Sequence, residues 1–540
     1  MSQIINFLPP KELWPERIYT LPEYKDYPKK MNSTEELLDK NLEKGKGKKV
    51  AILFEDKEFT YEDVYYQCNQ LANGLKSLGI GVEDRIIIRS PNIPQAVIAN
   101  FAIIKLGAIS VPTSPLFTAK ELAYVSNNCE VKALITFFEL LPDVEKAKPD
   151  LKTVKHIIVI GGDPAQIRDK GFIPVQDIMQ AADKEFSPVR RDRHDISILL
   201  YTSGTTGPPK GTAHMMEEPL IVSDGFGKYC WRVTENDVIG GSAPLAFGAG
   251  HATFCAIPYR FGATASLIAK FTPEDMFETI QKHRITVITL SPTAYRKMLE
   301  VPDAEKKYDL SSLRILTGGG ESLTAKTYYD WKNKFGHEIF ESLGTTEMFF
   351  VFISNAVSLK AKPGSIGQAV PGYEVKIINE EGKEVGVGES GMLIARGPTG
   401  TIYWAAPEKQ KACVIKGWNK IGDFVYRDED NYFWFLSRED DLIKSSGYRI
   451  GPEEIELALV AHPAVADAGV IGVPDPVRGQ NVKAFIVLKQ GYSPSDALKE
   501  EILAFLKENI AIYKLPREIE FINELPRTVT GKLLRRVLRQ

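Results

Sequence analysis

The stretch that decides the fold reads ISILLYTSGTTGPPKG and covers residues 196–211, an apolar run followed directly by a loop of glycines and hydroxyl side chains. A short apolar run that ends at a turn predicts a buried β-strand. In the loop, the backbone N–H groups freed by glycine, the hydroxyls and the Lys210 ammonium are groups that cradle a polyphosphate. A Walker A loop needs Gly before its Lys and Ser or Thr after it, whereas Lys210 lies between Pro209 and Gly211. The stretch therefore predicts a different phosphate loop, which holds a nucleoside triphosphate.

Helices and buried strands alternate on both sides of this loop, a pattern typical of parallel sheets with helices on both faces. The other strands that we expect lie at 85–88, 156–160, 285–290 and 314–317. The helices that we expect lie at 33–42, where Ser33 heads a capping pattern, at 61–78 and at 94–106. The fold class that follows is α/β, with two α/β lobes in a large N-terminal domain.

The pattern changes twice toward the C-terminus. Short alternating strands with Gly-rich turns predict a small β-rich subdomain at about 364–437. The last hundred residues predict a compact α+β domain, with a helix from Pro452, strands at 466–473 and 482–488, a helix at 495–509 and a final strand at 518–522. We expect the large domain to cover 1–437 and the small domain to cover 443–540.

Composition narrows the classes of partner. The 540 residues hold 67 Lys and Arg against 70 Asp and Glu, a net charge of −3 that gives no general attraction for nucleic acid. Five cysteines without a CxxC pair indicate a reducing cytosol, and seven histidines without an HExxH motif give a zinc site little support. Neither a signal peptide nor an apolar stretch of about 20 residues is visible. We expect a cytoplasmic monomer or homodimer whose partners are small molecules rather than nucleic acid or membrane.

The loop at 201–211 resembles the phosphate-loop signature of the adenylate-forming superfamily, which includes acyl-CoA synthetases, peptide-synthetase adenylation domains and luciferases. The other motifs occur in the family's order, from roughly Thr34 to Arg536. The turn at 318–321, GGGE, resembles the family turn that packs on adenine. The stretch GTTE at 344–347 is similar to the Y-G-x-T-E motif, whose Thr contacts the α-phosphate and whose Glu holds Mg²⁺. Leu343 departs from this motif, because many members carry Tyr there.

The resemblance continues in the last quarter of the chain. It implies that Asp423 accepts hydrogen bonds from both ribose hydroxyls and that Arg438 reaches the nucleotide. Residues 438–442 form the implied hinge, with Asp440 as its pivot. The motif PRTVTGK at 526–532 implies that Lys532 is the adenylation lysine, a compact positive charge beside the α-phosphate.

The residues that the resemblance implicates fall into four sets. The nucleotide-binding set is Thr202, Ser203, Gly204, Thr205, Thr206, Gly207, Lys210, Gly318, Gly319, Gly320, Glu321, Leu343, Gly344, Thr345, Thr346, Asp423, Arg438 and Lys532. The catalytic set is Lys532, Thr346, Glu347 and Lys210, with Glu347 as the Mg²⁺ ligand. The acyl pocket is expected at Ala246, Phe247, Gly318 and Phe350, and the coenzyme A tunnel at Gly447, Tyr448 and Arg449.

The activity implied is that of an ATP-dependent carboxylate–CoA ligase with ATP, Mg²⁺ and coenzyme A. An acid and ATP form an acyl-adenylate and pyrophosphate, the mobile small domain turns about Asp440, and coenzyme A then takes the acyl group and releases AMP. His251 is either a base for the thiol or a structural or substrate-lining residue. An enzyme that loads a separate carrier protein and a nucleotide-binding pseudoenzyme stay open as alternatives.

The acid is left open between two classes. Residues 344–355 and 363–375 look most like the benzoate and aminobenzoate CoA ligase branch, which favours an aryl acid. Phe350, however, takes the place of a histidine that benzoate ligases carry in the pocket. A small or medium-chain aliphatic acid therefore stays open.

Overall fold

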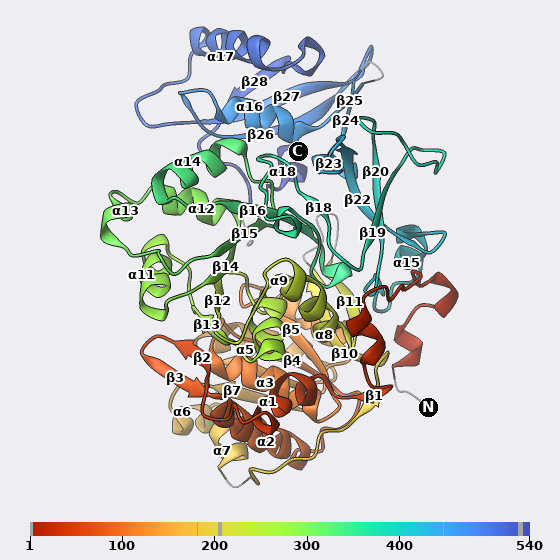
Figure 1. Ribbon diagram of the computed structural model, residues 1–540, viewed down its shortest axis with the longest axis vertical. Coiled ribbons are helices and arrows are strands. Elements are labelled where there is room, and N and C mark those ends of the chain that lie inside the picture. The colour runs from red at the N-terminus through yellow and green to blue at the C-terminus, as the bar shows by residue number, and fades with distance from the viewer. Residues whose placement is uncertain (1–3, 181, 203–207, 446–447, 528–532, 540) are drawn as a thin grey trace.

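The apolar run before the phosphate loop is strand β10 (Ile196–Thr202) of a seven-stranded sheet in the computed structural model (Figure 1). The structure describes all residues except 1–3, 181, 203–207, 446–447, 528–532 and 540, and only the backbone of 448–449. In order, the strands of this sheet are β11 (Lys210–Met215), β10, β5 (Ile109–Thr113), β4 (Arg85–Arg89), β6 (Ala133–Phe137), β7 (His156–Ile160) and β8 (Ile173–Pro174). All neighbours pair in parallel except β10 and β11.

Both faces of this sheet are buried, as the alternation of side chains along β4 shows. Ile86 and Ile88 belong to one hydrophobic core, whereas Ile87 belongs to another on the opposite face. The helices of this lobe are α2 (Tyr61–Ser77), α3 (Pro94–Lys105), α4 (Ala119–Asn128), α5 (Leu141–Ala147), α6 (Pro164–Asp169) and α7 (Val175–Met179). The predicted parallel sheet with two covered faces is confirmed.

The second lobe is built on a nine-stranded sheet. In order, its strands are β18 (Gln368–Ala369), β17 (Val351–Ser354), β16 (Ile339–Gly344), β15 (Ile315–Gly319), β14 (Val287–Leu290), β12 (Val238–Gly241), β13 (Thr264–Leu267), β2 (Val50–Phe54) and β3 (Lys57–Thr60). Its helices are α8 (Glu218–Val222), α9 (Gly248–His251), α10 (Ile257–Phe261), α11 (Pro273–His283), α12 (Pro292–Leu299), α13 (Ala304–Lys307) and α14 (Ala325–Phe335). Strands β2 and β3 come from the N-terminal part of the chain, so the two lobes interlock.

The expected capped helix at 33–42 is only partly correct. This segment forms a π-helical turn (Glu35–Asp39) and the short helix α1 (Lys40–Glu43), and no side chain caps either of them. The Ser33 hydroxyl donates to the carbonyl of Met216 instead, and the Asn32 amide donates to the carbonyl of Ile104 at 2.8 Å. The polar groups of a local capping pattern are therefore used for tertiary contacts.

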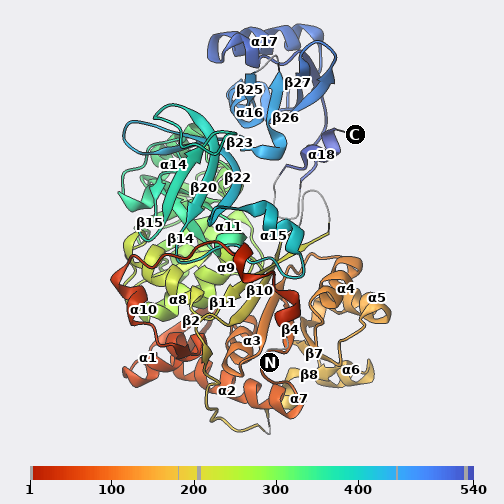
Figure 2. The same cartoon turned by 90° about the vertical axis from the view of Figure 1, so that its right-hand side faces the viewer.

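The remaining elements form the predicted β-rich subdomain and the predicted small domain, which lies at the top of Figures 1 and 2. The subdomain holds β19 (Glu374–Ile378), β20 (Ser390–Arg396), α15 (Pro407–Cys413), β21 (Val414–Ile415), β22 (Trp418–Arg427) and β23 (Phe433–Arg438). The small domain holds β24 (Ile443–Ser445), β25 (Tyr448–Ile450), α16 (Pro452–Val460), β26 (Val465–Asp475), β27 (Gly479–Leu488), α17 (Asp496–Asn509), β28 (Glu518–Phe521) and α18 (Arg535–Leu538). The small domain has a hydrophobic core of its own, around Ile455, Val470 and Ile502.

The segment ahead of the first lobe lies across the large domain as 3₁₀ turns (Ile5–Phe7, Lys11–Leu13 and Pro22–Asp26) and strand β1 (Lys30–Met31), which pairs with β9 (Arg191–Asp192). Arg17 anchors this segment through an ion pair of 2.7 Å with the buried Glu218. The described part of this segment is therefore fixed to the large domain.

Candidate functional site

The two turn motifs lie side by side at the carboxyl ends of β15 and β16. These strands are parallel neighbours, with Gly319 opposite Ser342. Gly320 has a φ of +90°, which favours glycine, and a Cβ at Gly344 would lie 2.6 Å from the carbonyl oxygen of Phe350. In open parallel sheets, ligands bind at the carboxyl ends of the strands. The adenine turn and the Mg²⁺ motif are thus placed where such a sheet binds a nucleotide.

The phosphate loop connects β10 to β11. Thr202 and Lys210 are directly opposite each other in this antiparallel pair and form the base of the loop. The predicted contacts Ser203, Gly204, Thr205, Thr206 and Gly207 lie outside the described residues.

The chain at 402–404 brings the Mg²⁺ motif to the phosphate loop. It pairs with β11, because Ala213 N–H donates to the carbonyl of Ile402 and Trp404 N–H to that of Gly211, each at 2.8 Å. From this segment the hydroxyl of Tyr403 donates to Glu347 Oε1 at 2.9 Å. Burial and the charge of Glu347 raise the pKa of Tyr403, so its hydroxyl stays a hydrogen-bond donor.

Helix α15 brings further groups to this place. Burial raises the pKa of the Cys413 thiol to about 12, with Glu347 adding to the rise and Lys210 opposing it, so both charges lie near the thiol. Burial lowers the pKa of the exposed Lys409, and the charge of Lys210 lowers it further. Lys210 and Lys409 are therefore close enough for their charges to interact. Sequence reasoning missed Lys409 and Tyr403, because neither belongs to a motif and only the pairing of 402–404 with β11 places them.

Asp423 and Arg438 form the second charged pair of the site. They lie opposite each other on β22 and β23, and Arg438 Nη1 is 2.7 Å from Asp423 Oδ1. Asp423 is fully buried, whereas the Arg438 side chain is half exposed. The charge of Asp423 raises the pKa of Arg438, with smaller contributions from Glu347 and Asp440. The expected ribose contact and nucleotide contact are therefore neighbours of the Mg²⁺ motif.

Three predicted nucleotide contacts have protein partners in this structure. The Glu321 carboxylate accepts from the N–H of Thr293 at 2.9 Å at the start of α12. Leu343 packs against the hydrophobic core of the β-rich subdomain, and Thr345 caps the 3₁₀ turn at Thr346–Met348. Any contact of Glu321 with adenine would therefore come from its backbone.

The residues expected in the acyl pocket lie next to the turn motifs. Ala246 and Gly318 are buried, and Phe247 immediately precedes α9. The Phe350 ring is buried against Phe226 and Trp231, with ring centroids 5.1 and 5.9 Å away. Phe350 thus joins the predicted pocket to the hydrophobic core.

His251, weighed as a base for the thiol, is buried at the end of α9. Burial lowers the pKa of its imidazole to about 3, with the nearby His214 adding to the effect. Its Nε2 is 3.3 Å from the amide oxygen of Asn100. A buried neutral imidazole of this kind fits a structural or substrate-lining residue better than a base for the thiol.

The small domain meets the large one close to Asp423. The hydroxyl of Ser322, in the turn after β15, donates to Glu453 Oε2 of α16 at 2.6 Å. Burial raises the pKa of Glu453 to about 7; Arg535 opposes this rise, and Glu456 and Asp423 add to it. Glu453 is thus a titratable group at the contact between the domains.

The implied hinge follows directly after β23. Asp440 is exposed in the 3₁₀ turn at Glu439–Asp441, and its carbonyl accepts from Arg539 at 3.2 Å. Tyr448 and Arg449, the expected tunnel residues, lie on strand β25. Gly447 and Lys532 lie outside the described residues.

The donors around Glu347 suit magnesium. Among the described residues, no group of three or more His, Cys, Asp and Glu side chains could hold a metal ion by itself. Mg²⁺ commonly binds through one or two carboxylates together with waters and substrate phosphates, so one carboxylate beside a phosphate loop is a sufficient protein contribution. None of the helices in the described part of the chain combines the length and the apolarity that crossing a membrane requires.

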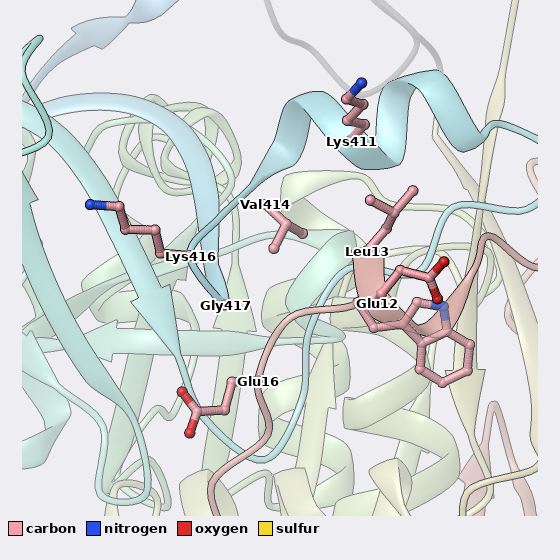
Figure 3. Close-up of a pocket in the computed structure, with 8 residues that line it drawn as sticks. Glu12, Leu13, Glu16, Lys411, Val414, Lys416 and Gly417 are labelled. Carbon is pink, nitrogen blue, oxygen red and sulfur yellow. The ribbon is translucent and has the colours of Figure 1, made fainter.

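Figure 3 shows a pocket of about 280 Å³ elsewhere, between the N-terminal segment and the end of α15. Glu12, Leu13, Trp14, Glu16, Lys411, Val414, Lys416 and Gly417 line it. None of the motif residues is among them, so this pocket is not part of the candidate site.

Comparisons with known proteins agree with this geometry. The family model of the AMP-binding enzymes matches residues 38–404, and that of the AMP-binding enzyme C-terminal domain matches residues 454–532. The acetyl-coenzyme A synthetase of Bacillus subtilis is 35% identical over 522 residues, covering 94% of this chain and 90% of the relative. The benzoate–CoA ligase of Thauera aromatica is 32% identical over 518 residues, covering 95% and 96%.

A solved structure of an anthranilate CoA ligase in complex with anthranoyl-AMP matches with a TM-score of 0.90 and 34% identity, over 95% of this chain and 98% of that one. The resemblance to the adenylate-forming superfamily, and to its benzoate and aminobenzoate CoA ligase branch, is confirmed. The chain belongs to the AMP-binding enzyme family and is an AMP-forming acyl-CoA synthetase.

Proposed function

We propose that this enzyme activates an aryl carboxylic acid in two steps at one site, first as an acyl-adenylate and then as a coenzyme A thioester. The observation that carries the proposal is the convergence of Glu347, Lys210 and the Asp423–Arg438 pair beside the carboxyl ends of β15 and β16. One group of each kind that adenylation needs is present: a cation for the phosphates, a carboxylate for a metal and a carboxylate for the ribose.

In the first step, a carboxylate oxygen of the acid attacks the α-phosphorus of ATP, and the bond to pyrophosphate breaks. Lys210, at the base of the phosphate loop, would neutralise the departing pyrophosphate together with Lys409, whose charge interacts with that of Lys210. Lys532 would neutralise the charge that builds on the α-phosphate. Glu347, oriented by Tyr403, would hold Mg²⁺, which when bound offsets phosphate charge.

In the second step, the thiol sulfur of coenzyme A bonds to the acyl carbon, AMP leaves with the electron pair of the acyl–oxygen bond, and the thiol proton is released. We propose that 1–437 and 443–540 turn relative to each other about the hinge at 438–442, with Asp440 as pivot. This rotation would withdraw Lys532 and bring Gly447, Tyr448 and Arg449 to the thioester site.

The aryl acid is favoured over an aliphatic one by two observations. The benzoate and anthranilate ligases match over nearly their whole length, and three aromatic residues, Phe247, Phe349 and Phe350, lie at the expected pocket. A short aliphatic acid is the second candidate, because an acetyl-coenzyme A synthetase is equally similar.

The test is ATP- and acid-dependent pyrophosphate release over a panel of aryl and aliphatic acids, with and without coenzyme A. We expect signal for aryl acids, with AMP and thioester formed only when coenzyme A is added. Signal for C4 to C8 acids and none for benzoates would overturn the aryl assignment. Adenylation without transfer to coenzyme A would favour a carrier-protein acceptor. Tight ATP binding without pyrophosphate release for any acid would favour the pseudoenzyme.

A further inference from the structure

The ring of Phe349, two residues after Glu347, lies against two buried imidazoles. The ring centroids of His214 and His251 are 4.8 and 5.5 Å from it, and both imidazoles meet it edge to face. Phe349 has φ +67° and ψ −45°, a conformation that L-residues rarely adopt. Such backbone strain is held in place only by the surrounding structure and concentrates at functional sites.

Three polar atoms of this cluster have no hydrogen-bond partner among the described residues: Asn100 Nδ2, His214 Nε2 and His251 Nδ1. The three side chains are at most 2% exposed. Buried polar groups in native proteins are nearly always paired, because an unpaired one costs stability. Three such atoms in one cluster beside the strained backbone of Phe349 mark this cluster as a candidate binding site.

The hydrogen bonds that these side chains do make show what the missing partner must offer. His251 is neutral and its Nε2 faces Asn100 Oδ1, so the ring proton lies on Nε2 and Nδ1 is a bare acceptor. Asn100 Oδ1 is already used, because it also accepts from Ser110 Oγ at 2.7 Å. Neither N–H of the Asn100 side-chain amide has an acceptor among the described residues.

His214, the second imidazole against the Phe349 ring, also has one paired ring nitrogen. Its Nδ1 is 2.7 Å from Glu218 Oε2, and Glu218 also pairs with Arg17, so Nδ1 carries the proton that the carboxylate accepts. Nε2 of His214 has no partner among the described residues. The cluster thus combines the acceptor of His251, the amide group of Asn100 and the unpaired Nε2 of His214.

This cluster continues the expected acyl pocket. The backbone N–H of His251 donates to the backbone carbonyl of Phe247 at 2.9 Å, so Phe247 lies one helical turn before His251, at the start of α9. Phe349 directly precedes Phe350 and follows the Mg²⁺ motif. The polar cluster therefore lies next to the residues that would hold the acid and not at an unrelated part of the core.

We propose that Asn100, His214 and His251 form the specificity end of the acyl pocket and select an aryl acid that carries a hydroxyl or amino substituent. This inference rests on the proposed function. A hydroxyl can donate to His251 Nδ1 and accept from the Asn100 amide, and an amino group can donate to His251 Nδ1. An acid with a methyl group there leaves all three atoms unpaired, and sites built to hydrogen-bond a substrate reject analogues that cannot.

The experiment compares kcat/KM for pyrophosphate release between hydroxy- or aminobenzoates and the methylbenzoates of the same substitution pattern. We expect at least one hydroxy or amino isomer to exceed its methyl counterpart by 100-fold or more. His251→Phe and Asn100→Leu should reduce this ratio to below tenfold, mainly by lowering kcat/KM for the polar acid. His251→Asn, which keeps an acceptor near the place of Nδ1, should restore part of the preference.

The control variant is His283→Phe. This histidine is also buried, but both of its ring nitrogens have partners, Ser266 Oγ at 2.7 Å and the Glu55 carbonyl at 3.0 Å. It should leave the ratio unchanged. Thermal unfolding of each variant, with and without the polar acid plus ATP, separates loss of folding from loss of selection, because only a folded variant shows the ATP-dependent rise in Tm.

Two different failures are distinguishable. If no acid in the panel gives pyrophosphate, the proposed function fails. If benzoate or methylbenzoates are adenylated as fast as the polar isomers, or the ratio is the same in His251→Phe as in the wild type, the activity stands and the specificity role of the cluster is wrong.

Discussion

The half of the site on the large domain and the half on the small domain are held in different ways. Thr202, Lys210 and Tyr403 are fixed by backbone pairing between strands, as are Asp423 and Arg438. At the other half, Glu453 meets the large domain through the side chain of Ser322. Backbone hydrogen bonds between paired strands keep the site residues at fixed positions, whereas a single side-chain contact can break and form again.

This difference suggests a division of work. Under the proposed two-step mechanism, groups that bind ATP in both half-reactions belong on the large domain, and groups used in only one half-reaction belong on the small domain. The following predictions test whether the two halves separate in this way, since variants of the large domain should affect every step that uses the nucleotide and variants of the small domain only one.

The largest effect is expected for Lys532→Ala. Removing the charge beside the α-phosphate should lower the rate of adenylation about 1000-fold, in line with the loss of an electrostatic transition-state contact. Thioester formation from preformed acyl-adenylate should stay within about threefold of the wild type. The measurement is each half-reaction separately, and equal loss of both would contradict the two-state use of the small domain.

Tyr403→Phe tests the half of the site that lies on the large domain. Loss of the hydrogen bond to Glu347 should lower kcat/KM for adenylation about tenfold, equivalent to about 1.4 kcal/mol, because the bond is made to a charged group. The concentration of Mg²⁺ needed for half-maximal rate should rise. Tyr426→Phe is the control, since that ring stacks on Trp434 in the same subdomain and does not contact the site residues. An unchanged Mg²⁺ requirement would show that Tyr403 does not orient Glu347.

Arg535→Lys tests whether the ion pairs of Arg535 fix the position of the small domain relative to the implied hinge. Arg535 is buried, lies three residues after Lys532, and pairs with Asp441 at 3.1 Å and Glu456 at 2.7 Å. Lysine keeps the charge but not the forked geometry, so we expect adenylation to fall about fivefold while thioester formation changes little. The exposed Arg536→Lys serves as control. Equal loss in both half-reactions would show that Arg535 only stabilises the small domain.

Much of the fold could be predicted because the helical and strand patterns are locally consistent. The helix expected at 61–78 is α2, and the strands at 85–88 and 156–160 are β4 and β7. The joining of β2 and β3 to the second sheet could not be predicted, because pairing between distant strands leaves no local pattern. The cap expected at Ser33 was wrong for the same reason, since its hydroxyl has a tertiary partner.

The prediction of the site residues from the sequence had the same limit as the prediction of the fold. Motifs predicted Lys210 and Glu347, because each stands in a short pattern with a chemical purpose, whereas Asp423 was implied only by the resemblance to the family. Tyr403 and Lys409 reach the site only through the pairing of 402–404 with β11. Residues that act through a fold contact therefore escape a reading of motifs, however clear the motifs are.

Glu453→Gln should have the smallest effect, seen only as a change in pH dependence. The pKa of Glu453 is raised to about 7 from an ordinary 4.5, so the observed domain arrangement favours the protonated carboxyl. The stabilisation of this arrangement is complete below about pH 4.5 and is lost as pH rises through about 7. The groups that face it are Ser322, Asp423 and Glu341 from the large domain and Glu456 and Arg535 from its own.

The glutamine variant keeps a neutral side chain at all pH values, so the population of this arrangement should change less than twofold between pH 5 and 8, against several-fold in the wild type. Distance measurements between labels on the two domains give this population directly. Glu454→Gln is the matched control, because the next carboxylate along α16 pairs with Lys514 inside the small domain. If both variants respond to pH as the wild type does, the contact between Ser322 and Glu453 does not control the position of the small domain relative to the large domain.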